Sequence, residues 1–130
     1  MTTITSDSVT LNKPAKEVFN FLADMNNLQQ IMPEQVEKWT SSVDACHFSV
    51  KGMASLGLKV IERVPNSKIA LTRNGNAPFE YTITCHISED GPKSKVHMVF
   101  ESDMNMMMKM MAERPLTNFI NMLVHGLEKV

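Results

Sequence analysis

The chain has 130 residues, of which 43% are hydrophobic and 21% are charged, and its formal net charge is -1. This length and composition are typical of one globular domain, so we expect a single domain over residues 1–130. So small a net charge excludes the strongly basic surface with which many proteins bind nucleic acid. No apolar run approaches the roughly 20 residues of a membrane-spanning helix, so membrane insertion is not expected.

The first residues and the cysteines indicate a cytoplasmic protein. Residues 1–7 are polar and lack the basic start and apolar stretch of a signal peptide. The only two cysteines, Cys46 and Cys85, lie far apart and without the spacing of metal ligands, which favours reduced, buried thiols. We therefore predict a cytoplasmic location, with no metal and no cofactor.

The start of the chain is predicted to form a strand followed by two short helices. Residues 2–11 are rich in β-branched side chains, as strands are. Pro14 suits the first position of a helix that should end near Asp24. Residues 26–32 are predicted to form a second short helix, which Pro33 stops.

Between residues 36 and 103 the hydrophobic pattern changes to a period of two, which is typical of an antiparallel sheet with one buried face. Turns rich in Asn, Gly and Pro separate the alternating runs, so about six strands joined as hairpins are expected here. With the opening strand, the sheet should have about seven strands. The strand residues predicted to point inward are Phe48, Val50, Leu58, Val60, Phe79, Tyr81, Ile83, Met98 and Phe100.

The C-terminal segment returns to helical spacing, with Asn105 suited to be the N-cap. Pro115 cannot donate the hydrogen bond that a helix interior needs, which predicts a kink or break near Glu113. The inward face of this helix is predicted to carry Met107, Met111, Phe119, Ile120 and Leu123.

Methionine is unusually frequent: there are 12 in the chain, five of them between Met106 and Met111. Because methionine is flexible and polarisable, such a run suits ordinary core packing, an adaptable pocket wall or a surface for variable partners.

The order of elements resembles the START-like, or SRPBCC, superfamily, which includes birch-pollen-allergen-like proteins, polyketide cyclases and coenzyme Q-binding proteins. The resemblance rests on residues 13–19 (KPAKEVF), residues 31–34 (IMPE), residues 105–111 (NMMMKMM) and residues 114–119 (RPLTNF). It implies an α+β helix-grip fold, in which a curved antiparallel sheet wraps round a long C-terminal helix and leaves a cavity between them.

No catalytic residue is predicted. Neighbouring strand residues point to opposite faces, so neither cysteine has a base beside it on its own face. The histidines show no metal-binding spacing, and Glu101 falls on the solvated side of its strand. By alternation or helical position, the side chains expected to face solvent include His47, His86, His97 and His125.

Three functions stay open at this point. The first is binding of a small hydrophobic molecule, such as a lipid, isoprenoid or aromatic metabolite, between the sheet and the last helix. Tyr81 and Trp39 combine an apolar ring with a polar group that can orient such a ligand. The alternatives are a cyclase- or hydratase-type enzyme using the same pocket, and an interaction module in which the methionine-rich segment contacts a protein partner or a second copy.

Overall fold

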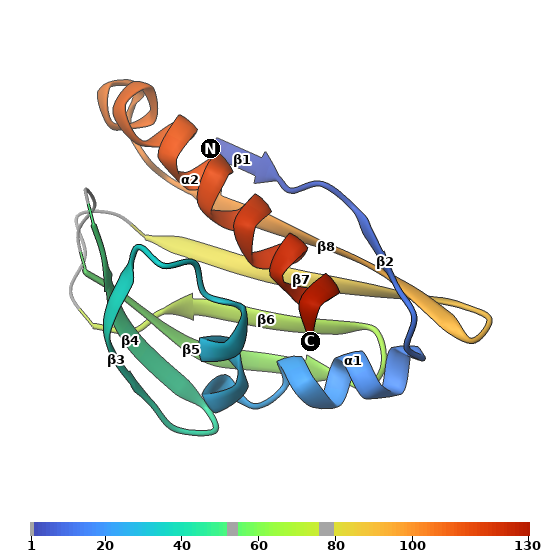
Figure 1. Cartoon of the computed structure of the whole chain (residues 1–130). Helices are drawn as coiled ribbons and strands as arrows, with labels where there is room; N and C mark the ends of the chain where they lie inside the picture. Colours follow the sequence, from blue (N-terminus) through green and yellow to red (C-terminus); the bar gives the residue numbers. More distant parts are fainter. Residues whose placement is uncertain (1, 52–54, 76–79) are drawn as a thin grey trace.

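The computed structural model describes residues 2–51, 55–75 and 80–130 (Figure 1). Within them the chain forms two short strands, two short helices, six further strands and a long helix that ends in a 3-10 turn. The helices are α1 (Ala15–Leu22), η1 (Met25–Ile31), α2 (Met106–Gly126) and η2 (Leu127–Lys129). The strands are β1 (Thr2–Thr5), β2 (Val9–Leu11), β3 (Val36–Ser41), β4 (Ala45–Val50), β5 (Ser55–Val64), β6 (Lys68–Arg73), β7 (Tyr81–Asp90) and β8 (Lys93–Ser102).

The strands of the described residues form one antiparallel sheet in the order β1-β8-β7-β6-β5-β4-β3, and β2 also pairs with β8. The predicted meander is confirmed from β3 to β8. The opening strand is divided, which makes eight strands in the described ranges where about seven are predicted. At the break, Ser6 Oγ accepts a hydrogen bond from the Met98 N–H at 2.8 Å. A side-chain oxygen thus replaces a backbone acceptor and interrupts the ladder.

The sheet and α2 enclose the core. Figure 1 shows α2 lying across one face of the sheet, with α1 near the C-terminal end of that helix. Buried residues of α1, η1 and α2 belong to one hydrophobic cluster with the inward side chains of the strands. The predicted arrangement, a curved antiparallel sheet that grips a C-terminal helix, is confirmed.

Local signals explain the two short helices. α1 follows Pro14 and buries Val18 and Leu22 on one side. η1, a 3-10 helix, begins after Asp24, whose carboxylate accepts a hydrogen bond from the Asn26 N–H at 3.0 Å. Both predicted helices are therefore present, with ends displaced by one or two residues.

Two of the predicted turns need a left-handed backbone. Asn66, between β5 and β6, has φ of 62°, and Gly91, between β7 and β8, has φ of 65°. Asparagine and glycine tolerate this region better than other residues do. The third predicted turn, at residues 74–76, is described only as far as Gly75.

α2 is continuous through Pro115, so of the kink or break predicted near Glu113 the break is absent. Asn105 caps the helix as predicted, because its side-chain oxygen accepts a hydrogen bond from the Met108 N–H at 2.9 Å. Beyond the proline, Thr117 Oγ1 donates to the Glu113 carbonyl at 2.7 Å, a contact that often bends helices. Figure 1 shows the first turns of α2 pointing in a different direction from the rest. In the described ranges no helix is long and apolar enough to cross a membrane.

Candidate functional site

The inward residues of the sheet and of α2 are packed against one another. Ten of the predicted cavity residues are no more than 6% exposed, whereas Trp39 and Val60 are half-buried. Phe79 lies outside the described residues. The inward orientation of the ten buried residues follows from alternation along the strands and from helical spacing along α2, while their contact with a ligand stays a prediction. The ten buried residues are Phe48, Val50, Leu58, Tyr81, Ile83, Met98, Phe100, Phe119, Ile120 and Leu123.

The predicted inward orientation is wrong for Met107 and Met111, whose side chains are 73% and 76% exposed. Because α2 continues through the proline, the helical phase is kept, and Met111 lies about 140° round the axis from Leu116, at about 100° per residue. In the first turns of α2, the side chains that face the core are instead Met108 and Ala112, which are half-buried and pack against it.

An aromatic column connects β3 to α2. The rings of Trp39 and Phe48 stack with 5.4 Å between centroids, and Phe48 stacks on Phe119 at 5.9 Å. The Trp39 indole N–H donates to Ser41 Oγ at 3.0 Å, and this hydroxyl donates to Asn26 Oδ1 at 2.6 Å. The polar end of Trp39 therefore has a protein partner, and its ring supplies an apolar surface.

The Tyr81 hydroxyl is also bound to the protein. It donates to the Gly57 carbonyl at 2.8 Å and accepts from the Gly57 N–H at 3.3 Å. Burial raises the pKa of Tyr81, and the hydrogen bond to Gly57 opposes that rise. The ring stacks on Phe100 with 6.0 Å between centroids. Tyr81 thus ties β7 to β5 across the end of β6, which is a structural role.

The buried thiols are poor nucleophiles. Burial raises the pKa of Cys46 and the pKa of Cys85 to about 12, so both are neutral at pH 7. Among the described residues, these cysteines and Tyr81 are the titratable side chains that are buried. A cyclase-type reaction inside the core would therefore depend on the shape of the pocket and not on these groups as acids or bases near pH 7.

The predicted outward orientation of the histidines is confirmed. His47 and His125 are exposed, and His86 and His97 are half-buried on the outer face of the sheet. The hydrogen bonds of His125 with Asp7 and Glu128 raise its pKa. No group of three or more His, Cys, Asp or Glu residues in the described ranges is arranged to hold a metal ion.

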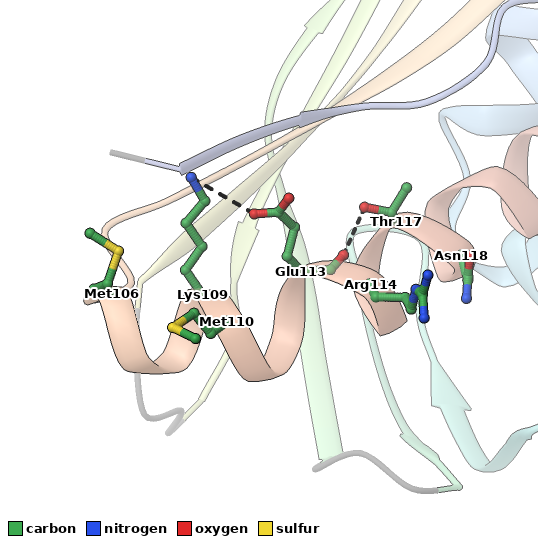
Figure 2. Close-up of a pocket in the computed structure, with 7 residues that line it drawn as sticks. All are labelled: Met106, Lys109, Met110, Glu113, Arg114, Thr117 and Asn118. Carbon is green, nitrogen blue, oxygen red and sulfur yellow. Dashed lines mark hydrogen bonds and ion pairs between the residues drawn. The ribbon is translucent and has the colours of Figure 1, made fainter.

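A hollow of about 540 Å³ runs along one side of the first turns of α2 (Figure 2). Lys109 Nζ lies 3.8 Å from Glu113 Oε2, while Arg114 has no ion pair within the described part of the chain. These polar residues carry no distinguishing signal in the sequence, because charges at this spacing occur on any solvated helix. The hollow is lined by Met106, Lys109, Met110, Glu113, Arg114, Thr117 and Asn118.

Comparison with known families gives a match over residues 2–130 to the family described as polyketide cyclase / dehydrase and lipid transport. No curated protein matches the chain in sequence.

Solved structures agree with the fold. A START superfamily protein from Mycobacterium smegmatis has a TM-score of 0.69 at 14% identity, covering 98% of this chain and 97% of that one. A protein from Thermus thermophilus has a TM-score of 0.75 at 12% identity, covering 98% and 95%. The di-domain aromatase/cyclase BexL of the BE-7585A biosynthetic pathway has a TM-score of 0.65 at 15% identity, covering 98% of this chain and 47% of that one. The START-like fold predicted from the sequence is thus confirmed.

Proposed function

Because the chain belongs to the polyketide cyclase / dehydrase and lipid transport family, we propose that it binds a small hydrophobic molecule between the sheet and α2. A lipid, an isoprenoid or an aromatic metabolite fits the apolar character of this region. The observation that carries the proposal is a half-buried apolar strip where the first turns of α2 meet the core.

This strip joins α2 to the aromatic column. Met108 and Ala112 lie on the same side of α2 as Phe119, because Ala112 follows Met108 by four residues and Phe119 follows Ala112 by seven. Phe119 leads through Phe48 to Trp39, which is itself half-buried. A flexible methionine can move aside at modest cost, so we place the entrance here. The deeper residues already pack together, and a ligand that reaches them must displace the first turns of α2.

The size of the ligand sets the affinity. Burying about 300 Å² of apolar ligand surface contributes roughly 7 kcal/mol at about 25 cal/mol per Å². Association costs about 4 kcal/mol or more, which leaves binding at the millimolar level or weaker. A physiological ligand is therefore expected to bury more apolar surface, or to form hydrogen bonds with the protein at this entrance.

Trp39 offers a direct test, because it is the only tryptophan of the chain and stacks within the proposed site. The purified chain is titrated with dodecanoic acid and with 1-anilinonaphthalene-8-sulfonate while Trp39 emission is recorded. Ala112→Phe should fill the strip and weaken binding of the probe by about tenfold or more, which is about 1.4 kcal/mol. Met111→Phe adds a ring on the exposed side of the same helix and is the matched control.

The proposal is contradicted if neither probe changes Trp39 emission, or if Met111→Phe weakens binding as much as Ala112→Phe. Native mass spectrometry of the chain isolated from its own cells gives an independent readout, since a bound hydrophobic molecule appears as added mass.

A second candidate function is protein interaction through the methionine face, defined as Met106, Met107, Met110 and Met111 of α2. These side chains are 76%, 73%, 80% and 76% exposed. Large apolar side chains gathered at one place on a surface often mark an interaction site. The purified chain allows this to be tested for the case of a second copy.

We expect sedimentation velocity at rising concentration to show a dimer that dissociates when Met107 and Met111 are both changed to glutamine. Changing both to leucine preserves the apolar surface and should leave the dimer intact. A chain that stays monomeric at every concentration contradicts this prediction for the homodimer.

A further inference from the structure

Two histidines face each other on the outer face of the sheet, opposite the face that α2 covers. His86 of β7 and His97 of β8 are direct partners in the antiparallel register. Their rings lie 4.9 Å apart between centroids, with 18° between the planes. Their sequence neighbours Cys85 and Met98 are buried in the core, so alternation places both imidazoles outside it.

Both rings are available to an ion from solution. Each is half-buried, and neither has a hydrogen-bond partner in the described part of the chain. An unbonded ring nitrogen of a neutral imidazole keeps a lone pair that can bind a metal.

The charges near the pair are of both signs. Lys68 lies opposite His86 in the register of β6 and β7, but its ammonium pairs with Glu62 at 2.7 Å. Lys95 follows on the same side of β8, and Glu101 lies further along that side. The site therefore faces both signs of charge and has no uniform positive field that would exclude a cation.

We propose that His86 and His97 together chelate one divalent transition-metal ion, with water completing its coordination. In the stacked arrangement the in-plane lone pairs of the two rings run side by side, so each ring must turn about its Cβ–Cγ bond to bind the same ion. Directly opposed strand residues have Cβ atoms about 4.5–5.5 Å apart, which lets the turned imidazoles converge on one ion at about 2.0–2.1 Å. Imidazole ligands suit Zn²⁺, Cu²⁺ and Ni²⁺, which defines the class of ion. The site lies on the face of the sheet opposite the proposed ligand site and does not depend on it.

Calorimetric titration of the full chain with ZnCl₂, and with CuSO₄ followed by electron paramagnetic resonance, tests the proposal. We expect one ion to bind per chain, with nitrogen coupling from two imidazoles in the Cu²⁺ spectrum. His86→Gln and His97→Gln should each lower the affinity for the metal ion by about tenfold or more. Losing a residue that only hydrogen-bonds a metal ligand already costs about that much, and here a ligand itself is lost. Both side chains face outward, so circular dichroism should show folded variants.

The matched control is His125→Gln. His125 contacts two carboxylates, with its Nε2 2.9 Å from Asp7 Oδ2 and its Nδ1 2.7 Å from Glu128 Oε1. His125 is thus a histidine whose ring nitrogens already have carboxylate partners, and its loss should leave the titration unchanged. The proposal is overturned if the native chain binds no metal. It is also overturned if His125→Gln removes the binding while His86→Gln and His97→Gln keep it.

Discussion

Gly57→Ala should lower the free energy of unfolding by about 3 kcal/mol or more, at the upper end of the usual cost of overpacking. A Cβ at this position would lie 2.0 Å from the Asn74 carbonyl oxygen and 2.7 Å from the His47 ring. The carbonyl oxygen cannot move aside easily, because His47 Nε2 lies 3.0 Å from it. The Asn74 N–H also donates to the Gly57 carbonyl at 3.0 Å, which holds the two backbones together.

Denaturant unfolding followed by circular dichroism measures this loss. Gly91→Ala is the matched control, because nothing lies within 4 Å of its added Cβ. Its left-handed backbone makes alanine cost about 1–2 kcal/mol, a smaller effect of different origin. Adding His47→Ala to Gly57→Ala should not restore stability, since the nearest atom belongs to the backbone. Restoration by that second change would show that the side chain, and not the carbonyl, causes the clash.

Tyr81→Phe should destabilise the chain by about 1–3 kcal/mol, because the buried Gly57 N–H loses the hydroxyl oxygen that accepts its hydrogen bond. The Gly57 carbonyl still accepts from the Asn74 N–H, which places the expected loss in the lower half of that range. Tyr81→Ala also removes the ring that stacks on Phe100 and should cost about 3–5 kcal/mol.

The phenol itself gives a second readout, because Tyr81 is the only tyrosine of the chain. Burial raises its pKa in the folded state above the ordinary value of a tyrosine. A raised folded pKa means that the stabilisation is present below the unfolded pKa and is lost as the pH rises through the folded pKa. Phenolate absorbance should therefore appear at higher pH in the folded chain than in denaturant. An ordinary titration, together with a near-native Tyr81→Phe variant, would show that the hydroxyl reaches water.

Local patterns in the sequence determined much of the architecture. The alternation around Ile83 and Cys85 identified the buried face of β7, because side chains in a strand alternate whatever lies beside them. Asn105 marked the start of α2, and Gly91 marked a hairpin turn, since a cap and a left-handed turn each depend on a few adjacent residues.

The same patterns failed where the outcome depended on distant contacts. The opening strand divides because Ser6 binds the backbone of Met98, which is 92 residues away in the sequence. Met107 was expected to face inward, but α2 continues through Pro115 and leaves this side chain exposed.

The sequence by itself therefore determined the helix-grip order of elements and which side of β4, β5, β7 and β8 is buried. Only the tertiary structure decided which side chains meet: Tyr81 with Gly57, His86 with His97, and Phe119 with Phe48. The physical reason is that periodicity fixes the face of a residue within its own element. Its partner on another strand or helix depends on register and packing, which no local pattern encodes.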